Sequence, residues 1–152
     1  MSATDPMATD PMPGAAEPPA WRRGMREFRR PLLWRAIGWF GIALLLVLSL
    51  IRPPSIDMPV EDADKLGHFL AYLVLTGWYG QLFRAHRDLQ KRALGFVLLG
   101  AAIEVLQWFT SYRSADWRDE VANCSGIAAA VLACRWTVLA GLLWRVERRY
   151  LS

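Results

Sequence analysis

Ionisable and amide side chains recur at helical spacing within otherwise apolar stretches of the sequence. In one stretch, Asp64, His68 and Tyr72 are four residues apart, so they share one face of a helix. In the next stretch, Glu104 and Gln107 are three residues apart and also share a face. Histidine and glutamate are among the side chains that most often transfer protons in catalysis. His68 and Glu104 are therefore the candidate catalytic residues.

A third polar group lies around the start of the last apolar stretch. If a helix begins near Asp116, Asp119 and Asn123 lie above each other with Asp116 beside them. Carboxylates are the ligands that hard divalent cations prefer, so Asp116 and Asp119 are candidate metal ligands and a divalent metal is a candidate cofactor. Lys65 and Arg113 can hold a phosphate or a carboxylate. The candidate substrate-binding residues are Lys65, Gln107, Arg113 and Asn123.

Each of these side chains also has a purely structural interpretation. Asp64 can be a helix cap, with Lys65 as an anchor at the membrane surface. Asp116 and Asp119 can be first-turn acids that the helix dipole favours. His68 can be an interior histidine with satisfied hydrogen bonds, whereas Glu104 is the hardest to explain in this way, because a carboxylate at its depth must be paired or protonated.

Four apolar blocks position these side chains. Hydrophobic residues make up 54% of the 152 residues, and their segregation into blocks favours a membrane protein over a soluble core. Each block has about 20 residues, enough for a helix to cross a bilayer. The expected spans are residues 31–51, 65–83, 93–112 and 121–144. The predicted fold class is all-α, a polytopic four-transmembrane-helix bundle with a disordered N-terminal tail.

The charges flanking these blocks predict the topology. Residues 1–30 carry a tandem repeat of Ala-Thr-Asp-Pro-Met and then an arginine-rich run, and we expect a disordered, basic cytoplasmic tail before a membrane domain of residues 31–152. The loop of residues 84–92 and the C-terminal end are also basic, whereas the loops of residues 53–64 and 113–120 are acidic or mixed. Because positive loops stay on the cytoplasmic side, both termini are predicted to be cytoplasmic and the acid-bearing loops outside.

This topology places the polar residues near the outer face. His68 lies about 5 Å into its span and Glu104 about 10 Å below the outer end of its own, so antiparallel packing puts both in one layer with Asn123. Ionisable groups within a membrane are costly and commonly mark function. Arg135 does not fit: it lies about 13 Å from the inner end of the fourth span, so either this span ends early or Arg135 pairs inside the bundle.

Other features exclude several classes of function. The net charge is +4, but the basic residues flank apolar blocks, so we expect membrane lipids as partners and no nucleic acid. Cys124 and Cys134 are about 15 Å apart on one helix, beyond the reach of a disulfide, which requires Cα atoms within about 7 Å. The sequence has no GxSxG, no phosphate-binding glycine loop and no HExxH motif.

The ordered set of motifs on three successive spans resembles the VanZ-like family of small bacterial membrane proteins. It consists of Asp64-Lys65-x-x-His68-Phe69, Glu104-x-x-Gln107, Arg113, Asp116, Asp119 and Asn123-x-x-Gly126, within about residues 60–131. The resemblance implies four or five spans and a multi-pass protein of the bacterial cytoplasmic (inner) membrane, in a cell-envelope setting. One founding member of the family is associated with teicoplanin resistance, and this antibiotic-resistance role is not assumed for the present chain.

Three hypotheses for function follow. The first is a membrane-embedded enzyme that acts on a lipid-linked or cell-wall substrate at the outer face. The second is a non-catalytic binding or accessory protein, in which the polar network is structural. The third, and least favoured, is a proton- or ion-coupled carrier with Glu104 and His68 as a relay, because four spans without a broken helix or inverted repeat are unlike known carriers.

Overall fold

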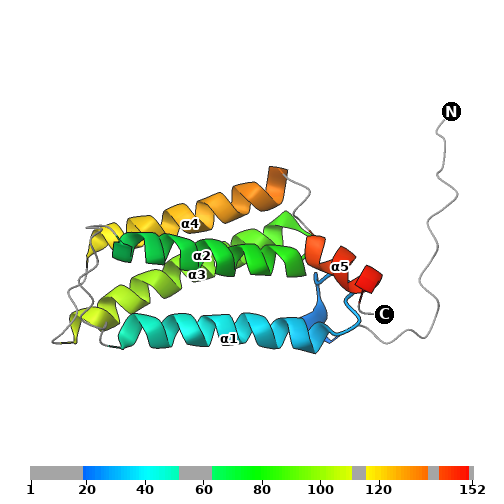
Figure 1. The fold of residues 1–152 in the computed structure, drawn as a ribbon, viewed down its shortest axis with the longest axis horizontal. Coiled ribbons are helices and arrows are strands. Elements are labelled where there is room, and N and C mark those ends of the chain that lie inside the picture. Colours follow the sequence, from blue (N-terminus) through cyan, green and yellow to red (C-terminus); the bar gives the residue numbers. More distant parts are fainter. Residues whose placement is uncertain (1–18, 52–62, 111–115, 137–140, 151–152) are drawn as a thin grey trace, which may run out of the picture.

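The computed structural model describes residues 19–51, 63–110, 116–136 and 141–150. Within these ranges the chain forms five α-helices and one short 3₁₀ helix, and no strand. Their bounds are η1 Ala20–Arg22, α1 Pro31–Leu50, α2 Ala63–Leu82, α3 His86–Trp108, α4 Trp117–Trp136 and α5 Leu142–Tyr150. In Figure 1, α1 to α4 run alongside one another, and α5 lies at the end of the bundle where α1 begins. The predicted all-α class is confirmed.

Helix α1 is more apolar than the other long helices, with Arg35 as its one charged residue. Among the described residues, it is the helix whose length and composition suffice for crossing a membrane. Its 20 residues extend for about 30 Å, which matches the hydrocarbon core of a bilayer. Helices α2, α3 and α4 have 20, 23 and 20 residues, so they are as long but carry more polar residues. The four expected spans thus correspond to four long helices.

The closest packing is between α2 and α4. Gly126 of α4 lies directly against the backbone of α2, where an added Cβ would stand 3.0 Å from Leu73 N and 3.1 Å from Phe69 C. Small residues allow helices in a membrane to approach in this way. Gly80 makes a similar approach further along α2, where a Cβ would overlap the sulfur of Cys134. Both cysteines are free thiols, which confirms that Cys124 and Cys134 do not pair.

The structure differs from the expectation of a disordered tail up to residue 30. Residues 1–18 lie outside the described residues, but the segment from residue 19 onward is ordered and joined to the end of α2. Arg26 N donates to Leu82 O at 2.8 Å, and Arg84 N donates to Gly24 O at 3.0 Å. Met25 and Phe28 are 7% and 2% exposed. These two apolar side chains bury enough surface to hold a segment whose arginines and prolines favour disorder.

The fourth expected span, residues 121–144, is also different in the structure. Helix α4 ends at Trp136, and α5 is a separate helix that begins after Gly141, whose φ of 81° favours glycine. Arg135 lies in the last turn of α4 and is exposed. Of the two alternatives for Arg135, the early end of the helix is therefore correct. The basic loop expected at residues 84–92 is shorter too, because α3 begins at His86.

Glu147 of α5 anchors the start of α1. It is 0% exposed, and its carboxylate accepts hydrogen bonds from Arg29 N at 2.8 Å, Arg30 N at 3.1 Å and Trp34 Nε1 at 2.6 Å. A negative charge at a helix N-terminus is also favoured by the helix dipole. Burial acts to raise the pKa of Glu147, but the hydrogen bonds from Trp34, Arg29 and Arg30 outweigh it and hold the pKa below its ordinary value.

Replacing Glu147 with alanine is expected to lower the free energy of unfolding by about 3 kcal/mol, because three donors lose a charged acceptor. Since the pKa is lowered in the folded state, this contribution is complete at neutral pH and is lost as the pH falls below 4.5 and through the lowered pKa. Thermal unfolding of the detergent-solubilised protein at neutral and acidic pH measures both effects. Glu27→Ala is the control, because Glu27 is exposed and its ion pair with Arg84 is a surface pair. An equal loss of unfolding free energy from the two substitutions would contradict the role of Glu147 as the anchor of α1.

Candidate functional site

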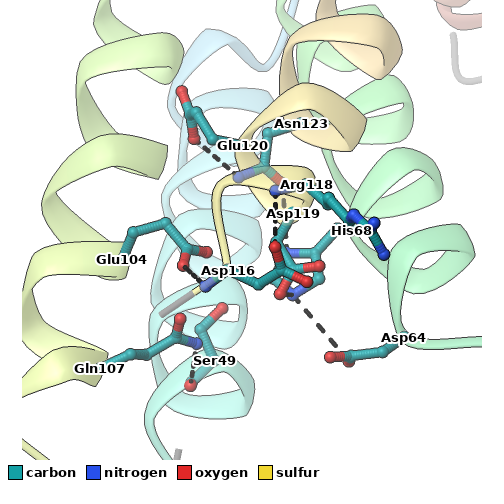
Figure 2. A network of polar contacts seen from close by, with 10 residues as sticks. All are labelled: Ser49, Asp64, His68, Glu104, Gln107, Asp116, Arg118, Asp119, Glu120 and Asn123. Atoms are coloured by element: carbon teal, nitrogen blue, oxygen red, sulfur yellow. Dashed lines mark hydrogen bonds and ion pairs between the residues drawn. The ribbon is translucent and has the colours of Figure 1, made fainter. Parts of the chain in front are cut away.

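Polar side chains from α2, α3 and α4 gather at the end of the bundle opposite α5 (Figure 2). His68 of α2 is at the centre and is 9% exposed. Its Nδ1 lies 3.2 Å from Asn123 Oδ1, and its Nε2 lies 3.7 Å from Asp119 Oδ2 and 3.9 Å from Asp64 Oδ1. Asp119 is 6% and Asn123 is 1% exposed. The structure thus brings His68 together with two of the predicted residues of α4 and with Asp64 of its own helix.

The Asn123 amide fixes the direction in which His68 presents its nitrogens. Asn123 Nδ2 donates to Glu120 Oε2 at 3.0 Å, so Asn123 Oδ1 faces the imidazole as an acceptor. An acceptor at this place requires Nδ1 of His68 to carry a proton. In the neutral ring Nε2 then carries the lone pair, and it points toward the carboxylates of Asp119 and Asp64. A histidine that is oriented by a hydrogen bond at one ring nitrogen and faces carboxylates with the other has an arrangement suited to proton transfer.

The same three side chains have the composition of a metal site. One ligand atom from each of Asp64, His68 and Asp119 lies within 4.8 Å of the others. A cation about 2.1 Å from each ligand atom requires separations of about 4 Å or less, so small side-chain rotations would suffice. The expected pair of metal ligands was Asp116 with Asp119. In the described residues Asp116 is not part of this group, and Asp64 and His68 take its place.

Asp116 instead caps α4 and connects it to α3. Its Oδ1 accepts from Arg118 N at 2.9 Å, and its backbone N–H donates to Glu104 Oε2 at 3.3 Å. Glu104, a predicted catalytic residue, is 9% exposed. Its other oxygen, Oε1, and Tyr72 Oη are buried without a hydrogen-bond partner among the described residues. A buried polar atom without a partner is costly, and it calls for an explanation such as a catalytic role or a bound water or ion.

The predicted substrate-binding residues fall in different places. Gln107 is 1% exposed, and its Nε2 donates to Ser49 O at 2.9 Å, so it connects α3 to the end of α1. Lys65 is half-buried at the start of α2, where its charge interacts with Asp119. Arg113 lies outside the described residues. Among the predicted residues that the structure describes, Asn123 makes a hydrogen bond with His68.

Glu120, which the sequence analysis did not single out, and Gly100, a small residue suited to close helix approach, shape the site. Glu120 orients Asn123 and also accepts from Cys124 Sγ at 3.6 Å. The spacing of three residues between Glu120 and Asn123 is the signal that would have found it. Gly100 of α3 leaves space for this group, because an added Cβ would stand 3.0 Å from Asn123 Nδ2 and 3.2 Å from Tyr72 Oη.

Fold and site together define an all-α protein with a buried histidine–aspartate–asparagine cluster between α2 and α4. The profile of the VanZ/LLP1 family matches residues 24–140, and the chain belongs to this family. The resemblance read from the motifs is thereby confirmed. Searches of curated proteins and of solved structures each found no match.

Proposed function

We propose that the chain is a multi-pass protein of the bacterial cytoplasmic membrane, with α1 to α4 as its four spans. Helix α1 is apolar enough to span alone, and α2 to α4 are at least as long. The outward faces of these three helices carry many apolar residues, which suits contact with lipid. Exposed residues on them include Leu66, Leu70, Val74, Leu94, Leu98, Val105, Val121 and Leu132. Polar residues buried between the helices include Thr76, Glu104, Gln107 and Asn123, as expected of polar groups within a membrane, whereas Arg118 and Arg135 near the ends of α4 are exposed.

The charges support an orientation with the polar cluster outside. The segment before α1, the connection between α2 and α3, and α5 lie at one end of the bundle (Figure 1). This end carries Arg22, Arg23, Arg26, Arg29, Arg30, Arg84, Arg145, Arg148 and Arg149. Positive charge concentrates on the cytoplasmic side of membrane proteins. Both termini are therefore assigned to the cytoplasm, and the His68 cluster to the outer face.

At this face the protein acts as a membrane-embedded enzyme on a lipid-linked or cell-wall substrate. The single observation that carries this proposal is the buried imidazole of His68, which Asn123 orients and which faces the buried carboxylate of Asp119. His68 transfers a proton through Nε2, and Asp119 stabilises the resulting positive charge. Proton transfer by a positioned side chain typically contributes about 10²–10⁴-fold to a rate.

The other residues of the cluster have supporting roles in this proposal. Asn123 and Glu120 position the ring, and Glu104 Oε1 with Tyr72 Oη offers hydrogen bonds to the reacting group. Lys65 lies beside the cluster, where its charge favours an anionic group such as a phosphate. A divalent cation, if bound by Asp64, His68 and Asp119, would polarise a substrate oxygen or a water molecule there.

A binding or accessory protein is the alternative, and two contacts favour it. Gln107 and Glu104 both hold backbone groups of other segments, Ser49 O and Asp116 N, so part of the network joins helices together. In this case the buried cluster stabilises a surface for an envelope partner. The two functions differ in what the loss of His68 does to envelope lipids.

Mass spectrometry of envelope lipids and cell-wall precursors, in cells with and without the protein, tests the proposal. We expect a lipid-linked species to accumulate without the protein, and to return to its normal level with the wild type but not with His68→Gln. His86→Gln is the matched control, because His86 is exposed at the start of α3, whereas Glu104 near the end of α3 lies at the cluster. Teicoplanin susceptibility is a second readout in the same strains. Full restoration by His68→Gln at normal membrane abundance would reject the enzyme.

A further inference from the structure

A groove between α1 and α2 leads along the bundle to His68. Its volume is about 620 Å³, and most of its lining is apolar. The walls include Ile37, Leu44, Leu48, Leu70, Val74 and Trp78. At the outer end the lining changes to Ser49, Asp64 and His68. The groove therefore has an apolar length and one polar end, and this end belongs to the functional cluster.

The dimensions of the groove match one hydrocarbon chain in one leaflet. The apolar lining residues run from Ile37 to Leu48 on α1, about 16 Å of helix, and from Leu70 to Trp78 on α2, about 12 Å. One leaflet contributes about 15 Å of hydrocarbon, half of the bilayer core of about 30 Å.

The groove is open along its side. Leu44 and Val74 in its walls are 44% and 69% exposed, so a lipid chain can enter it from the surface of the bundle. Toward the inner end α1 and α2 approach each other at Gly41, where a Cβ would stand 3.3 Å from Leu75 Cδ1. Trp78 is held there because its Nε1 donates to Trp34 O at 3.2 Å. At the outer end the exposed Gly67 lines the groove beside His68.

We propose that this groove binds one hydrocarbon chain of a lipid from the surrounding bilayer and presents the polar headgroup of that lipid to His68. The proposal rests on the proposed function, because it takes α1 and α2 as spans and His68 as the reacting group. A lipid fits both parts of the lining, since its chain fills the apolar walls and its headgroup meets the polar end.

Lipid photo-crosslinking measures the occupancy of the groove independently of activity. The purified protein is placed in proteoliposomes that contain a phospholipid with a diazirine on one acyl chain, and crosslinked positions are found by mass spectrometry. In the wild type we expect a higher yield at Leu44 and Val74, which line the groove, than at Leu98. Leu98 of α3 is 63% exposed and does not line the groove, so it reports ordinary lipid contact.

Gly67→Leu adds a side chain to the lining at the outer end of the groove, where it would displace the lipid chain, and is expected to lower the yield at Leu44 and Val74 to the level at Leu98. Gly77→Leu is the matched control: it lies on the same helix, does not line the groove, and a Cβ at either glycine has no atom within 4 Å. Both substitutions gain similar helix propensity. A yield at Leu44 and Val74 that equals Leu98 in the wild type, or that Gly67→Leu leaves unchanged, would overturn the groove proposal.

The variant His68→Gln separates this proposal from the function it rests on. We expect His68→Gln to keep the groove crosslinks while it fails to restore envelope lipids. If His68→Gln restores these lipids and the groove crosslinks persist, the enzyme is rejected and the lipid site stands. If the crosslinks show no preference for the groove while His68 is still required, the lipid site is rejected and the enzyme stands.

Discussion

Replacing Asp119 with alanine is expected to reduce activity about 100-fold or more, without loss of folded protein. Asp119 is buried, and its carboxylate is the nearer of the two that face Nε2 of His68, at 3.7 Å. Its negative charge is felt strongly because little water screens it. When it is removed, the positive charge that forms on His68 loses its closest partner, and the contribution of proton transfer is lost. The measurement is the amount of restored envelope lipid per unit of protein.

Asp64→Asn serves as the graded comparison for Asp119. The side chain of Asp64 is 63% exposed and lies 3.9 Å from the same nitrogen, so water screens its charge. We expect a loss of less than about 10-fold, because exposed ion pairs contribute about 1 kcal/mol or less. A metal ion held by both carboxylates would instead make both substitutions similarly damaging, and the metal content of the purified protein would fall with each. Similar losses of activity without a change in metal content would contradict both the charge effect of Asp119 and the metal site.

The helical part of the fold was predictable because long apolar runs and their charged flanks are local signals. Four of these runs became α1 to α4, with bounds that differ by several residues. The tail and the fourth span were predicted less well. Burial of Met25 and Phe28 depends on a contact with the end of α2, and apolarity alone does not reveal the break before α5 at Gly141. Both features are set by distant parts of the chain.

The site was predictable to a similar degree. Spacing along each helix placed Asp64, His68, Asp119 and Asn123 on shared faces, and the structure brings these faces together. Spacing does not show which atom of one helix meets which atom of another. Three features depend on how the helices pack. They are the hydrogen bond from Gln107 to Ser49 O, the hydrogen bond from Asp116 N to Glu104, and the presence of Asp64 rather than Asp116 in the candidate ligand group.

Replacing Gly126 with alanine is expected to lower the free energy of unfolding by about 3 kcal/mol and to abolish activity with it. The added Cβ would overlap the carbonyl of Phe69 and stand 3.0 Å from Leu73 N, and these backbone atoms cannot move aside without shifting the helix. Overpacking of a tight contact typically costs about 1–3 kcal/mol. Separation of α2 and α4 also moves His68 away from Asp119 and Asn123, because the two sides of the cluster are carried by these two helices.

Gly77→Ala provides the control for Gly126→Ala, because a Cβ at Gly77 has no atom within 4 Å. Alanine there should raise stability by up to about 1 kcal/mol, since glycine is a poor helix former. Thermal unfolding in detergent and envelope-lipid restoration are measured for both variants. If the proposed packing is correct, Gly126→Ala loses stability and function together, whereas Asp119→Ala loses function alone. A stable but inactive Gly126→Ala would show that the approach of α2 to α4 is needed for the geometry of the cluster and not for the fold. A stable and active Gly126→Ala would contradict the close contact between these helices, and with it the position of His68 against α4.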